Sequence, residues 1–550
     1  MPTRTILVVG GALSGPTAAT RAREIDEAAR IVVLEQGASV SYAVGGLAYH
    51  VSGEVASARS LDREQREFFE DVYRIETRTG VRVLAIDAAR HVVTLERETL
   101  SYDRLVYAAG AESIVPNLPG LDGATNVFRF RTLRDLRGIS ASLQRGARRV
   151  TILGGGYFGV EAADGFLRRR CTVTLVERET RILPRHSAAA ARRATSALEA
   201  EGATILTGVS ASAVKRRGAR LTAVLLTDGR TIKTDLLILA AGLRPRTDLL
   251  RQAGARLLEN GTVPIDARAA TSLPDVFACG VCVSVPQATT GVPIWFAQAA
   301  MADKTAQVAG ICAAGGDARI GPVLGTAILR AGKLTIARTG ITSADGESRG
   351  ATVDVHAASH DRFFPGATPV SIRLTYDDAT GRVLGAEITG RTGVDKRIDV
   401  LATAIAGGLS VEQLAALDLG YAPPYSAARD PVNVAGTVAS AARAGLATPW
   451  TPDAVHSDRT HVHLIDVRTD AERRSGTLAG ARGVPLASLR ADPHLREGRV
   501  VFVSETGRRA YLAARIARAA GVRDAGFLTG GLQSWLAAGY PVTSRKRGQR

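Results

Sequence analysis

The sequence predicts an α/β protein of several domains, two of which have a Rossmann-like nucleotide-binding fold. Two observations predict this class. The segment Ile6–Gly15 is typical of a buried strand followed by a glycine turn and the start of a helix, and Val150–Gly159 repeats the pattern. The chain of 550 residues is also too long for one core, because domains typically hold roughly 100–200 residues.

The glycine turns have the spacing of a dinucleotide-binding fingerprint. Each turn is followed by an apolar strand that ends in an acid, Glu35 in the first copy and Glu177 in the second. Glycine lets the backbone approach a pyrophosphate, the helix N-terminus offers free N–H groups to it, and the acid accepts hydrogen bonds from ribose hydroxyls. The glycines are Gly10, Gly11 and Gly15 in the first copy and Gly154, Gly156 and Gly159 in the second.

A second pair of segments repeats in the same order. Tyr102–Gly110 matches Thr234–Gly242, and both are typical of strands that end in a turn of small residues. Because the matched elements follow one another in the same order, the sequence predicts two nucleotide-binding units and two bound dinucleotides.

Composition limits the other classes of function. The longest apolar runs, such as Leu236–Ala241, are far shorter than the ~20 residues that span a bilayer, and a first strand explains the N-terminus better than a signal peptide. Four cysteines in the chain exclude a disulfide scaffold and fit a reducing cytoplasm. The net charge of +17 is spread along the chain, so we expect no nucleic-acid partner, and no histidine and cysteine spacing predicts a metal site.

The chain resembles the pyridine nucleotide-disulfide oxidoreductases, and within them it is most similar to the coenzyme A-disulfide reductases fused to a rhodanese domain. Besides the N-terminal glycine turn, the motifs that carry the resemblance are Ser41–His50, Tyr102–Ala111, Gly154–Glu161, Ala240–Arg246, Pro274–Gly280, Ala422–Gly436, Ile465–Arg468 and Gly530–Trp535. The resemblance implies FAD in the first unit, NADH or NADPH in the second, and a homodimer.

The resemblance also implies an order of domains. An FAD-binding domain in two parts, 1–120 and 246–322, flanks an NAD(P)H-binding domain, 121–245. An α+β dimerisation domain, 323–446, and a rhodanese-like α/β domain, 455–545, follow.

Cofactor contacts are implied in both nucleotide-binding units. Those implied for FAD are Gly10, Gly11, Gly15, Glu35, Ser41, Val81, Ala109, Gly110, Gly280 and Val281. Those implied for NAD(P)H are Gly154, Gly156, Tyr157, Gly159, Glu177 and Gly242. Glu177 favours NADH, because a carboxylate repels a 2′-phosphate, whereas Arg178 and Arg181 nearby would favour NADPH.

One departure from the family changes the expected chemistry. Family members carry a redox cysteine within a segment resembling S-F-A-N-C-G-L-P-Y, and Gly45 stands at the cysteine position of Ser41–Tyr49. Glycine forms neither a thiolate nor a mixed disulfide. The usual route from flavin through cysteine to a disulfide substrate is therefore absent at this position.

Further departures fall at the other implied sites. Ser504 stands at the reactive position of the rhodanese loop, where a hydroxyl carries no persulfide sulfur. Val281 replaces the acid that holds the ribityl chain of FAD. Phe363 and Phe364 replace a Tyr-Tyr pair of the substrate site, whereas the tyrosine of the other dimer-borne motif is kept as Tyr425.

Together these features predict an FAD-dependent NAD(P)H oxidoreductase that passes electrons directly to a small acceptor over Gly45. The acceptor classes are a quinone, an unsaturated compound such as an enone, a CoA- or carrier-linked thioester, or oxygen. Glu161 is expected to help hold the nicotinamide pocket, and Tyr425 to reach the acceptor. Arg21 and Arg23 resemble coenzyme A phosphate contacts, although two solvated arginines on a helix explain them equally well.

Two alternatives stay open. The replacements at Val44, Gly45, Val281 and Ser504 also fit a catalytically degenerate scaffold. Cys279-Gly280-Val281-Cys282 is a C-x-x-C at a strand-to-helix junction, which would allow disulfide or persulfide reduction. A buried and unreactive cysteine pair is the structural explanation of the same motif.

Overall fold

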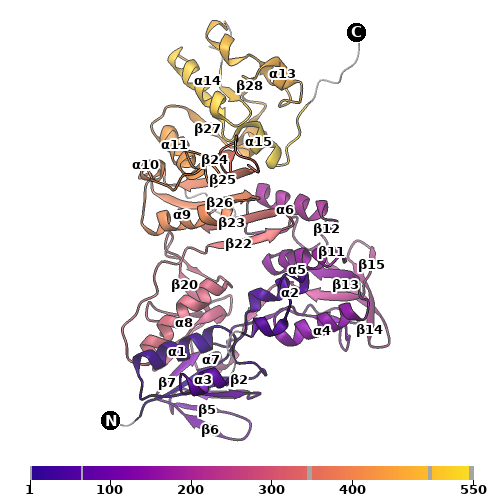
Figure 1. Ribbon diagram of the computed structural model, residues 1–550, viewed down its shortest axis with the longest axis vertical. Coiled ribbons are helices and arrows are strands. Elements are labelled where there is room, and N and C mark those ends of the chain that lie inside the picture. The colour runs from indigo at the N-terminus through magenta and orange to yellow at the C-terminus, as the bar shows by residue number, and fades with distance from the viewer. Residues whose placement is uncertain (1–2, 63–65, 343–349, 493–497, 544–550) are drawn as a thin grey trace. The chain divides into compact units, whose positions relative to one another are not determined.

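The chain divides into two compact units, which are described separately (Figure 1). The computed structural model describes residues 3–62, 66–342, 350–492 and 498–543. The first unit comprises Met1–Thr180 and Glu201–Gly325, and the second comprises Arg181–Ala200 and Thr326–Arg550. The predicted NAD(P)H-binding segment, 121–245, is therefore not one compact piece, because Arg181–Ala200 groups with the second unit.

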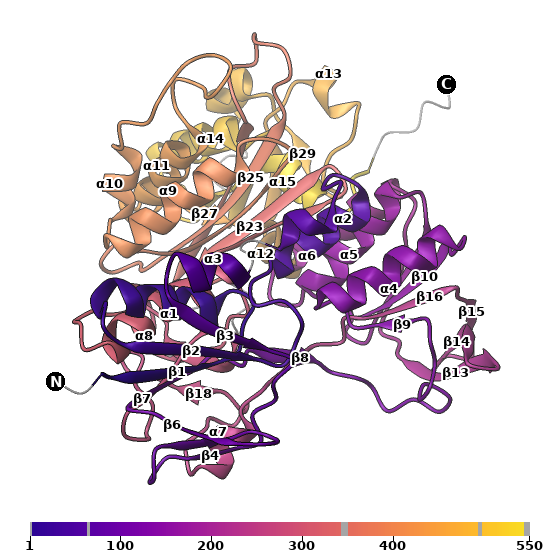
Figure 2. The ribbon, with the colours of Figure 1, turned by 60° about the horizontal axis from the view of Figure 1, so that its bottom comes forward.

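A five-stranded parallel sheet in the order β19-β7-β1-β2-β3 opens the first unit. Its strands are β1 (Thr5–Val9), β2 (Arg30–Glu35), β3 (Ile75–Thr79), β7 (Arg104–Tyr107) and β19 (Val276–Ala278). The central strands are runs of Ile, Leu and Val because both faces of a parallel sheet are covered. Helices α1 (Ser14–Ile25) and α8 (Ala299–Ala313) pack against each other and against this sheet (Figure 2).

A second parallel sheet, in the order β12-β11-β10-β16-β9, repeats the arrangement. Its strands are β9 (Val127–Phe128), β10 (Arg149–Leu153), β11 (Thr172–Glu177), β12 (Thr204–Thr207) and β16 (Leu236–Leu239). Its helices are α4 (Leu133–Gln144) and α5 (Tyr157–Arg168). The two predicted nucleotide-binding folds are thus present, each with its glycine turn at the carboxyl end of a central strand.

Short elements complete the first unit. The helices are α2 (Leu47–Ser52), α3 (Arg66–Asp71) and α7 (Asp248–Gln252). The strands are β4 (Ala85–Asp87), β5 (Val92–Thr94), β6 (Thr99–Ser101), β8 (Ala111–Ser113), β13 (Ala211–Arg217), β14 (Arg220–Leu226), β15 (Thr231–Lys233), β17 (Leu243–Pro245), β18 (Val263–Pro264), β20 (Val283–Pro286) and β21 (Pro293–Ile294).

An antiparallel sheet in the order β22-β23-β26-β25-β24 forms the start of the second unit. Its strands are β22 (Ala327–Ala331), β23 (Leu334–Gly340), β24 (Ala351–Ala358), β25 (Pro369–Tyr376) and β26 (Val383–Gly390). Helices α9 (Val394–Ala406) and α11 (Pro431–Arg443) pack on it, and α10 (Val411–Ala415) packs on α11. Helix α6 (Ala188–Ala200) packs on β22 and β23.

A parallel sheet in the order β27-β31-β30-β28-β29 ends the chain. Its strands are β27 (Thr448–Trp450), β28 (His463–Asp466), β29 (Arg482–Gly483), β30 (Val500–Val503) and β31 (Ala525–Leu528). Its helices are α12 (Pro452–Asp458), α13 (Asp470–Arg473), α14 (Arg508–Ala519) and α15 (Gly531–Ala537). Among the described residues, no helix has the length and apolar character needed to cross a membrane.

Candidate cofactor and acceptor site

The first glycine turn joins the carboxyl end of β1 to the N-terminus of α1. A Cβ added at Gly10 would lie 2.4 Å from the Ala108 carbonyl oxygen, and one at Gly15 would lie 1.8 Å from the Gly10 carbonyl oxygen. Only glycine fits these positions. The Glu35 carboxylate at the end of β2 accepts a hydrogen bond from the Gly11 N–H at 2.7 Å, so the acid and the turn are in contact.

The second turn, between β10 and α5, has the same geometry. A Cβ at Gly154 would lie 2.2 Å from the Ala240 carbonyl oxygen. The Glu177 carboxylate, only 8% exposed, accepts from the Gly155 N–H at 2.5 Å. By contrast, a Cβ at Gly156 would meet no atom within 4 Å, and α5 begins there without a side-chain cap. Open space over uncapped helix N–H groups fits a dinucleotide pyrophosphate.

The other predicted cofactor residues of the first unit lie close to these turns. Val81 follows β3 and donates its N–H to the Glu35 carbonyl oxygen at 3.0 Å, and Ser41 is buried. Gly110 follows β7 and Gly242 follows β16, and the strands that leave them, β8 and β17, pair antiparallel. The structure thus brings the two predicted cofactor sets to the carboxyl ends of their sheets, where α/β folds bind ligands.

Arg131 is a residue of this region that sequence reasoning missed. Its guanidinium lies 5.1 Å from the centre of the Phe158 ring, and burial lowers its pKa. Tyr42, Arg246 and the Asp135 carboxylate are close enough to influence that pKa, and Asp135 also accepts a hydrogen bond from the Arg131 backbone N–H at 3.2 Å. A partly buried guanidinium whose pKa is lowered by burial is a candidate partner for a phosphate. One arginine among many gives no sequence signal for this burial.

The predicted acceptor position is open. Val44–Gly46 forms a single 3₁₀ turn before α2, and Gly45 is exposed. A Cβ added at Gly45 would meet no atom within 4 Å, whereas one at Gly46 would lie 2.2 Å from Leu61 Cδ2. Helix α2 packs against α5. The two helices are so close that a Cβ added at Gly165 on α5 would lie 2.9 Å from the Ala48 carbonyl oxygen on α2. A side chain at position 45 would therefore point into free space.

The cysteine pair lies in a buried junction between β19 and β20. Cys279 and Cys282 are both fully buried, and the Cys282 thiol donates to the Cys279 carbonyl oxygen at 3.1 Å. Burial raises the pKa of Cys282 to about 12 and that of Cys279 well above its ordinary value. Both thiols are therefore protonated at neutral pH, which opposes their use as a redox pair.

The neighbouring predicted FAD residues also lie in this junction. A Cβ at Gly280 would lie 2.5 Å from Ser14 Oγ on α1, and the Gly280 N–H donates to Thr305 Oγ1 at 3.0 Å. Val281 offers its carbonyl oxygen to Trp295 Nε1 at 2.8 Å. The junction thus presents backbone and an apolar side chain where the family has an acid.

Glu161 lies one turn into α5, beyond Tyr157, and is half-buried. Burial, together with the nearby Asp164 carboxylate, raises the pKa of Glu161 to about 7. No described cation pairs with it, so its proton occupancy changes near neutral pH.

The predicted coenzyme A contacts on α1 require a correction. Arg23 is only 6% exposed, and its guanidinium donates to backbone carbonyl oxygens of Asp26, Glu27, Ala29, Tyr73 and Arg74. The prediction for Arg23 is wrong, because its donors are already used inside the fold. Arg21 is exposed and pairs with Glu24 at 2.6 Å.

The predicted acceptor-contacting aromatic residues are exposed on the second unit. Phe363 is 76% exposed and Tyr425 is 72% exposed, and Phe364 is partly exposed against the His360 ring. The Lys396 ammonium donates a hydrogen bond to the Tyr425 backbone carbonyl oxygen at 2.8 Å. These side chains are thus available to a neighbouring molecule.

The side chains of the loop that carries Ser504 form hydrogen bonds and ion pairs within the domain. Ser504 is buried, and its hydroxyl accepts from the Ala510 N–H at 3.0 Å in the first turn of α14, whose N-cap is Gly507. The carboxylate of Glu505 pairs with Arg468 at 3.0 Å, and Arg509 pairs with Glu472 at 2.6 Å. The serine and the remaining arginine of the motif therefore have structural partners.

Family models match most of the chain. The model described as pyridine nucleotide-disulphide oxidoreductase matches residues 4–302, and the corresponding dimerisation domain matches 331–431. The rhodanese-like domain matches residues 451–538.

Individual proteins are similar along the same regions. An NADH oxidase of Methanocaldococcus jannaschii is 28% identical over 439 residues, 78% of this chain and 97% of that protein. An NAD(P)H coenzyme A polysulfide/persulfide reductase of Pyrococcus horikoshii is 28% identical over 440 residues, 79% of this chain and 98% of that one. The solved structure of reduced Bacillus anthracis CoADR-RHD superposes with a TM-score of 0.93, at 30% identity and with 98% of each chain covered.

Proposed function

Because the chain belongs to the pyridine nucleotide-disulphide oxidoreductase family, we propose that it transfers electrons from NAD(P)H to a small acceptor without a redox cysteine. The observation that carries the proposal is Gly45. No side chain occupies the position where the family has its cysteine, and the space that a side chain would fill is open. The overall reaction is NAD(P)H plus a proton plus the oxidised acceptor, giving NAD(P)⁺ and the reduced acceptor.

The cofactors of the enzyme are FAD and NAD(P)H. When bound, FAD supplies two-electron transfer between the nicotinamide and the acceptor. We assign the FAD pyrophosphate to the turn at Gly10–Gly15, with Arg131 neutralising its charge and Glu35 binding its ribose. We assign NAD(P)H to the turn at Gly154–Gly159, with Glu177 binding the adenosine ribose and Glu161 beside the nicotinamide.

At the proposed acceptor site, the chain provides open space and apolar side chains. Gly45 leaves room for a flat quinone or enone, for an unsaturated thioester or for oxygen, and Val44 and Val281 replace polar groups of the family. The names of similar proteins include a water-forming NADH oxidase, which supports oxygen as an acceptor, and an NAD(P)H coenzyme A polysulfide/persulfide reductase, which supports a CoA-linked acceptor. Arg21 is the remaining candidate on α1 for a CoA phosphate.

A sulfur relay has little support within the described residues. All four cysteines are buried and unpaired, and Cys279 and Cys282 have strongly raised pKa values. At the position where a rhodanese has its cysteine, the Ser504 hydroxyl is buried and accepts from the Ala510 N–H of α14. We further propose a homodimer, in which Phe363, Phe364 and Tyr425 of one protomer contact the acceptor of its partner. These side chains are exposed, and they lie within the region that matches the family's dimerisation domain.

The test is anaerobic reduction of the FAD-loaded protein with NADH or NADPH, followed by rapid mixing with candidate acceptors. The flavin should bleach, and at least one of a quinone, an enone, an enoyl thioester or oxygen should restore its colour faster than coenzyme A disulfide does. Reoxidation by the disulfide alone would contradict the proposal. A protein that retains no FAD after reconstitution would instead support a scaffold.

Gly45→Cys is the matched variant for the acceptor position. The substituted thiol would meet no neighbour, so we expect one thiol per chain to react with an aromatic disulfide reagent in the native variant and none in the unmodified protein. An unreactive thiol in a folded Gly45→Cys protein would show that position 45 is closed to an acceptor.

A further inference from the structure

Helices α2 and α5 of the first unit lie side by side and run in the same direction (Figure 2). A Cβ added at Gly165 on α5 would lie 2.9 Å from the Ala48 carbonyl oxygen on α2. One turn further along both helices, the Arg169 guanidinium at the end of α5 donates to the Val51 carbonyl oxygen at 2.8 Å. These two contacts fix the register of the pair, in which four residues along α5 correspond to three along α2.

The same register places Glu161 level with Gly45. Glu161 precedes Gly165 by four residues, so both lie on the face of α5 that is turned towards α2. One turn before Ala48, the chain passes through the 3₁₀ turn Val44–Gly46, which leads directly into α2. Glu161 therefore belongs to the end of the helix pair at which the proposed acceptor site is open.

The surroundings of Glu161 favour its protonated form. The charged or titratable groups on α5 and on the segments packed against it are Tyr157, Asp164, Arg168 and Arg169 of α5 and its end, Tyr49 and His50 of α2, Arg131 beside Phe158, Arg149 of β10 and Glu177 of β11. Of these, the Asp164 carboxylate is the one whose charge changes the pKa of Glu161, and it adds to the increase caused by burial.

The proposed reaction needs a proton that NAD(P)H does not supply. NAD(P)H gives up a hydride, which carries an electron pair and a single proton, whereas a quinone or an enone takes up an electron pair and a pair of protons when it is reduced. The additional proton has to come from the protein or from water. A general acid placed at the acceptor typically accelerates such a step by about 10²–10⁴-fold, and it acts best when its pKa is near the working pH.

We propose that Glu161 is the proton donor to an acceptor bound over Gly45, and that this acceptor is a compound that takes up a proton on reduction, such as a quinone or an enone. As the hydride equivalent reaches the acceptor, the O–H bond of the Glu161 carboxyl breaks and its proton forms a new bond to an oxygen or a carbon of the acceptor. The carboxylate that remains takes a proton from water. The inference rests on the proposed function, because it needs electrons to leave directly over Gly45. The nicotinamide loses a hydride and needs no proton, so the acceptor is the reactant that uses this acid.

The test compares two acceptors on the FAD-loaded full chain, whose flavin is first reduced with an equivalent of dithionite so that no NAD(P)H is present. A benzoquinone takes up protons on reduction, and ferricyanide does not. At pH 6 we expect Glu161→Gln to slow the return of flavin colour by about 100-fold with the quinone and by less than about twofold with ferricyanide. In the unmodified protein, the quinone rate divided by the ferricyanide rate should fall as the pH rises through about 7.

Two further variants make the test specific. Asp228→Asn alters a carboxylate that pairs with Arg230 in the turn between β14 and β15, and it should change neither rate. Asp164→Asn keeps Glu161 but removes the carboxylate that raises its pKa, so the fall of the quinone rate should move to lower pH. Infrared difference spectra between pH 6 and pH 8 give a readout independent of activity. The C=O band of a protonated carboxyl should decrease in the unmodified protein but not in Glu161→Gln.

An unchanged quinone rate in folded Glu161→Gln, or an equal loss of rate with both acceptors, would overturn the inference and leave electron transfer over Gly45 in place. Reoxidation of the unmodified protein by coenzyme A disulfide alone would instead contradict the proposed function, so the two failures are distinguishable. If Glu161→Gln does not fold, Asp164→Asn decides, and a quinone profile that does not move in that variant overturns the inference.

Discussion

Individual replaced residues in this chain have acquired local partners. The Ser504 hydroxyl accepts from the Ala510 N–H in the first turn of α14, and the backbone carbonyl oxygen of Val281 accepts from Trp295 Nε1. Gly45 has acquired none, since the space beside it is empty. The replaced side chain at Ser504 is thus hydrogen-bonded inside the fold, whereas position 45 is open, which is the pattern expected if position 45 admits a ligand.

Glu161 allows a prediction on stability. Its pKa is about 7 in the folded chain against an ordinary value near 4.5, so folding favours the protonated form. Protonated Glu161 contributes to the free energy of unfolding. This contribution is fully present below pH ~4.5 and is lost as the pH rises through about 7. At pH 8, Glu161→Gln should therefore raise the free energy of unfolding of the FAD-loaded protein by about 1–3 kcal/mol, after allowance for partial exposure.

Denaturant unfolding without NAD(P)H, at pH 5 and at pH 8, measures this difference. The increase in the free energy of unfolding caused by Glu161→Gln should shrink towards zero at pH 5, because Glu161 is already protonated in the folded protein at that pH. Asp228→Asn is the control, because its carboxylate lies at the surface and its hydrogen bonds with Arg230 lower its pKa. A gain from Glu161→Gln that is equal at both pH values would refute the raised pKa.

At the scale of secondary-structure elements, the sequence predicts best what local pattern determines. The strand, turn and helix at Ile6–Gly15 and Val150–Gly159 follow from runs of buried aliphatic residues and from glycines at which an added Cβ would collide with backbone, namely Gly10, Gly15, Gly154 and Gly159. The course of α6 could not be predicted, because a crossover of that length is compatible with several packing surfaces. Burial of Arg23 could not be predicted either, since its carbonyl partners at 26–29 and 73–74 belong to separate loops.

The contact between α1 and α8 allows a prediction for a single methyl group. A Cβ added at Gly310 would lie 2.1 Å from the Ala18 carbonyl oxygen, which is backbone and cannot rotate away. Gly310→Ala should therefore separate the two helices and lower the free energy of unfolding by about 2–3 kcal/mol. It should also weaken FAD retention, because α1 begins at the first glycine turn.

Thermal unfolding followed by flavin fluorescence measures both effects of Gly310→Ala. Gly45→Ala is the control, because its added methyl meets no atom within 4 Å and should change stability by less than about 0.5 kcal/mol. Equal stability of the two variants would show that the helices adjust without cost.

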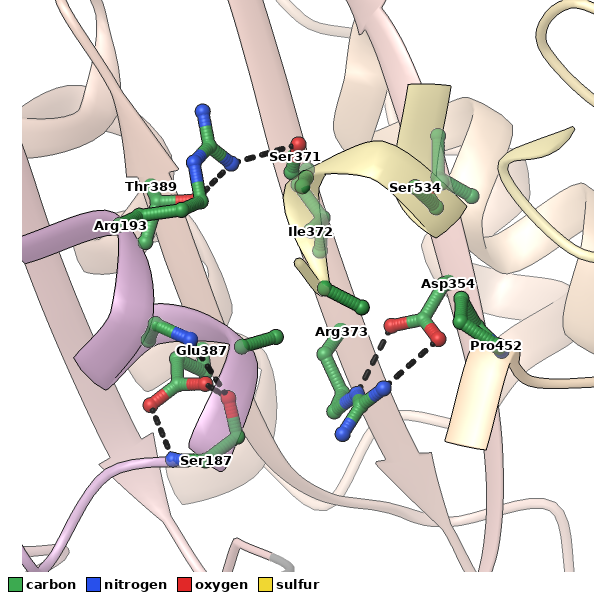
Figure 3. A pocket seen from close by; sticks show the side chains of 15 residues that line it. Ser187, Arg193, Asp354, Ser371, Ile372, Arg373, Glu387, Thr389, Pro452 and Ser534 are labelled. Carbon is green, nitrogen blue, oxygen red and sulfur yellow. Dashed lines mark hydrogen bonds and ion pairs between the residues drawn. The ribbon is translucent and has the colours of Figure 1, made fainter. Parts of the chain in front are cut away.

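At the scale of the whole molecule, ion pairs and hydrogen bonds connect the antiparallel sheet of the second unit to the C-terminal region that contains its parallel sheet. Arg373 on β25 forms two bonds with Asp354 on β24, at 2.8 and 2.9 Å (Figure 3), and a third with Asp453 on α12 at 3.2 Å. Tyr540 donates to the same Asp453 at 2.7 Å. The antiparallel sheet and the C-terminal region are thus joined by hydrogen bonds and ion pairs, so we expect them to unfold as one cooperative part.

Arg373→Met tests this joining. The variant leaves Asp354 buried with no cation, and breaking a buried pair typically costs about 3–5 kcal/mol, so the midpoint of unfolding of the second unit should fall. Two of the three tryptophans, Trp450 and Trp535, lie in the C-terminal region, so their fluorescence reports it. Flavin release reports the first unit and should keep its midpoint.

The double variant Arg373→Met with Asp354→Leu separates the charge effect from lost packing. Removing both partners eliminates the uncompensated carboxylate, so a large part of the stability should return. Recovery of the tryptophan midpoint, with an unchanged flavin midpoint in every variant, is the expected outcome, because the ion pair belongs entirely to the second unit. A flavin midpoint that falls together with the tryptophan midpoint would instead show that the two units unfold together, and would extend the cooperative part to the nucleotide-binding sheets.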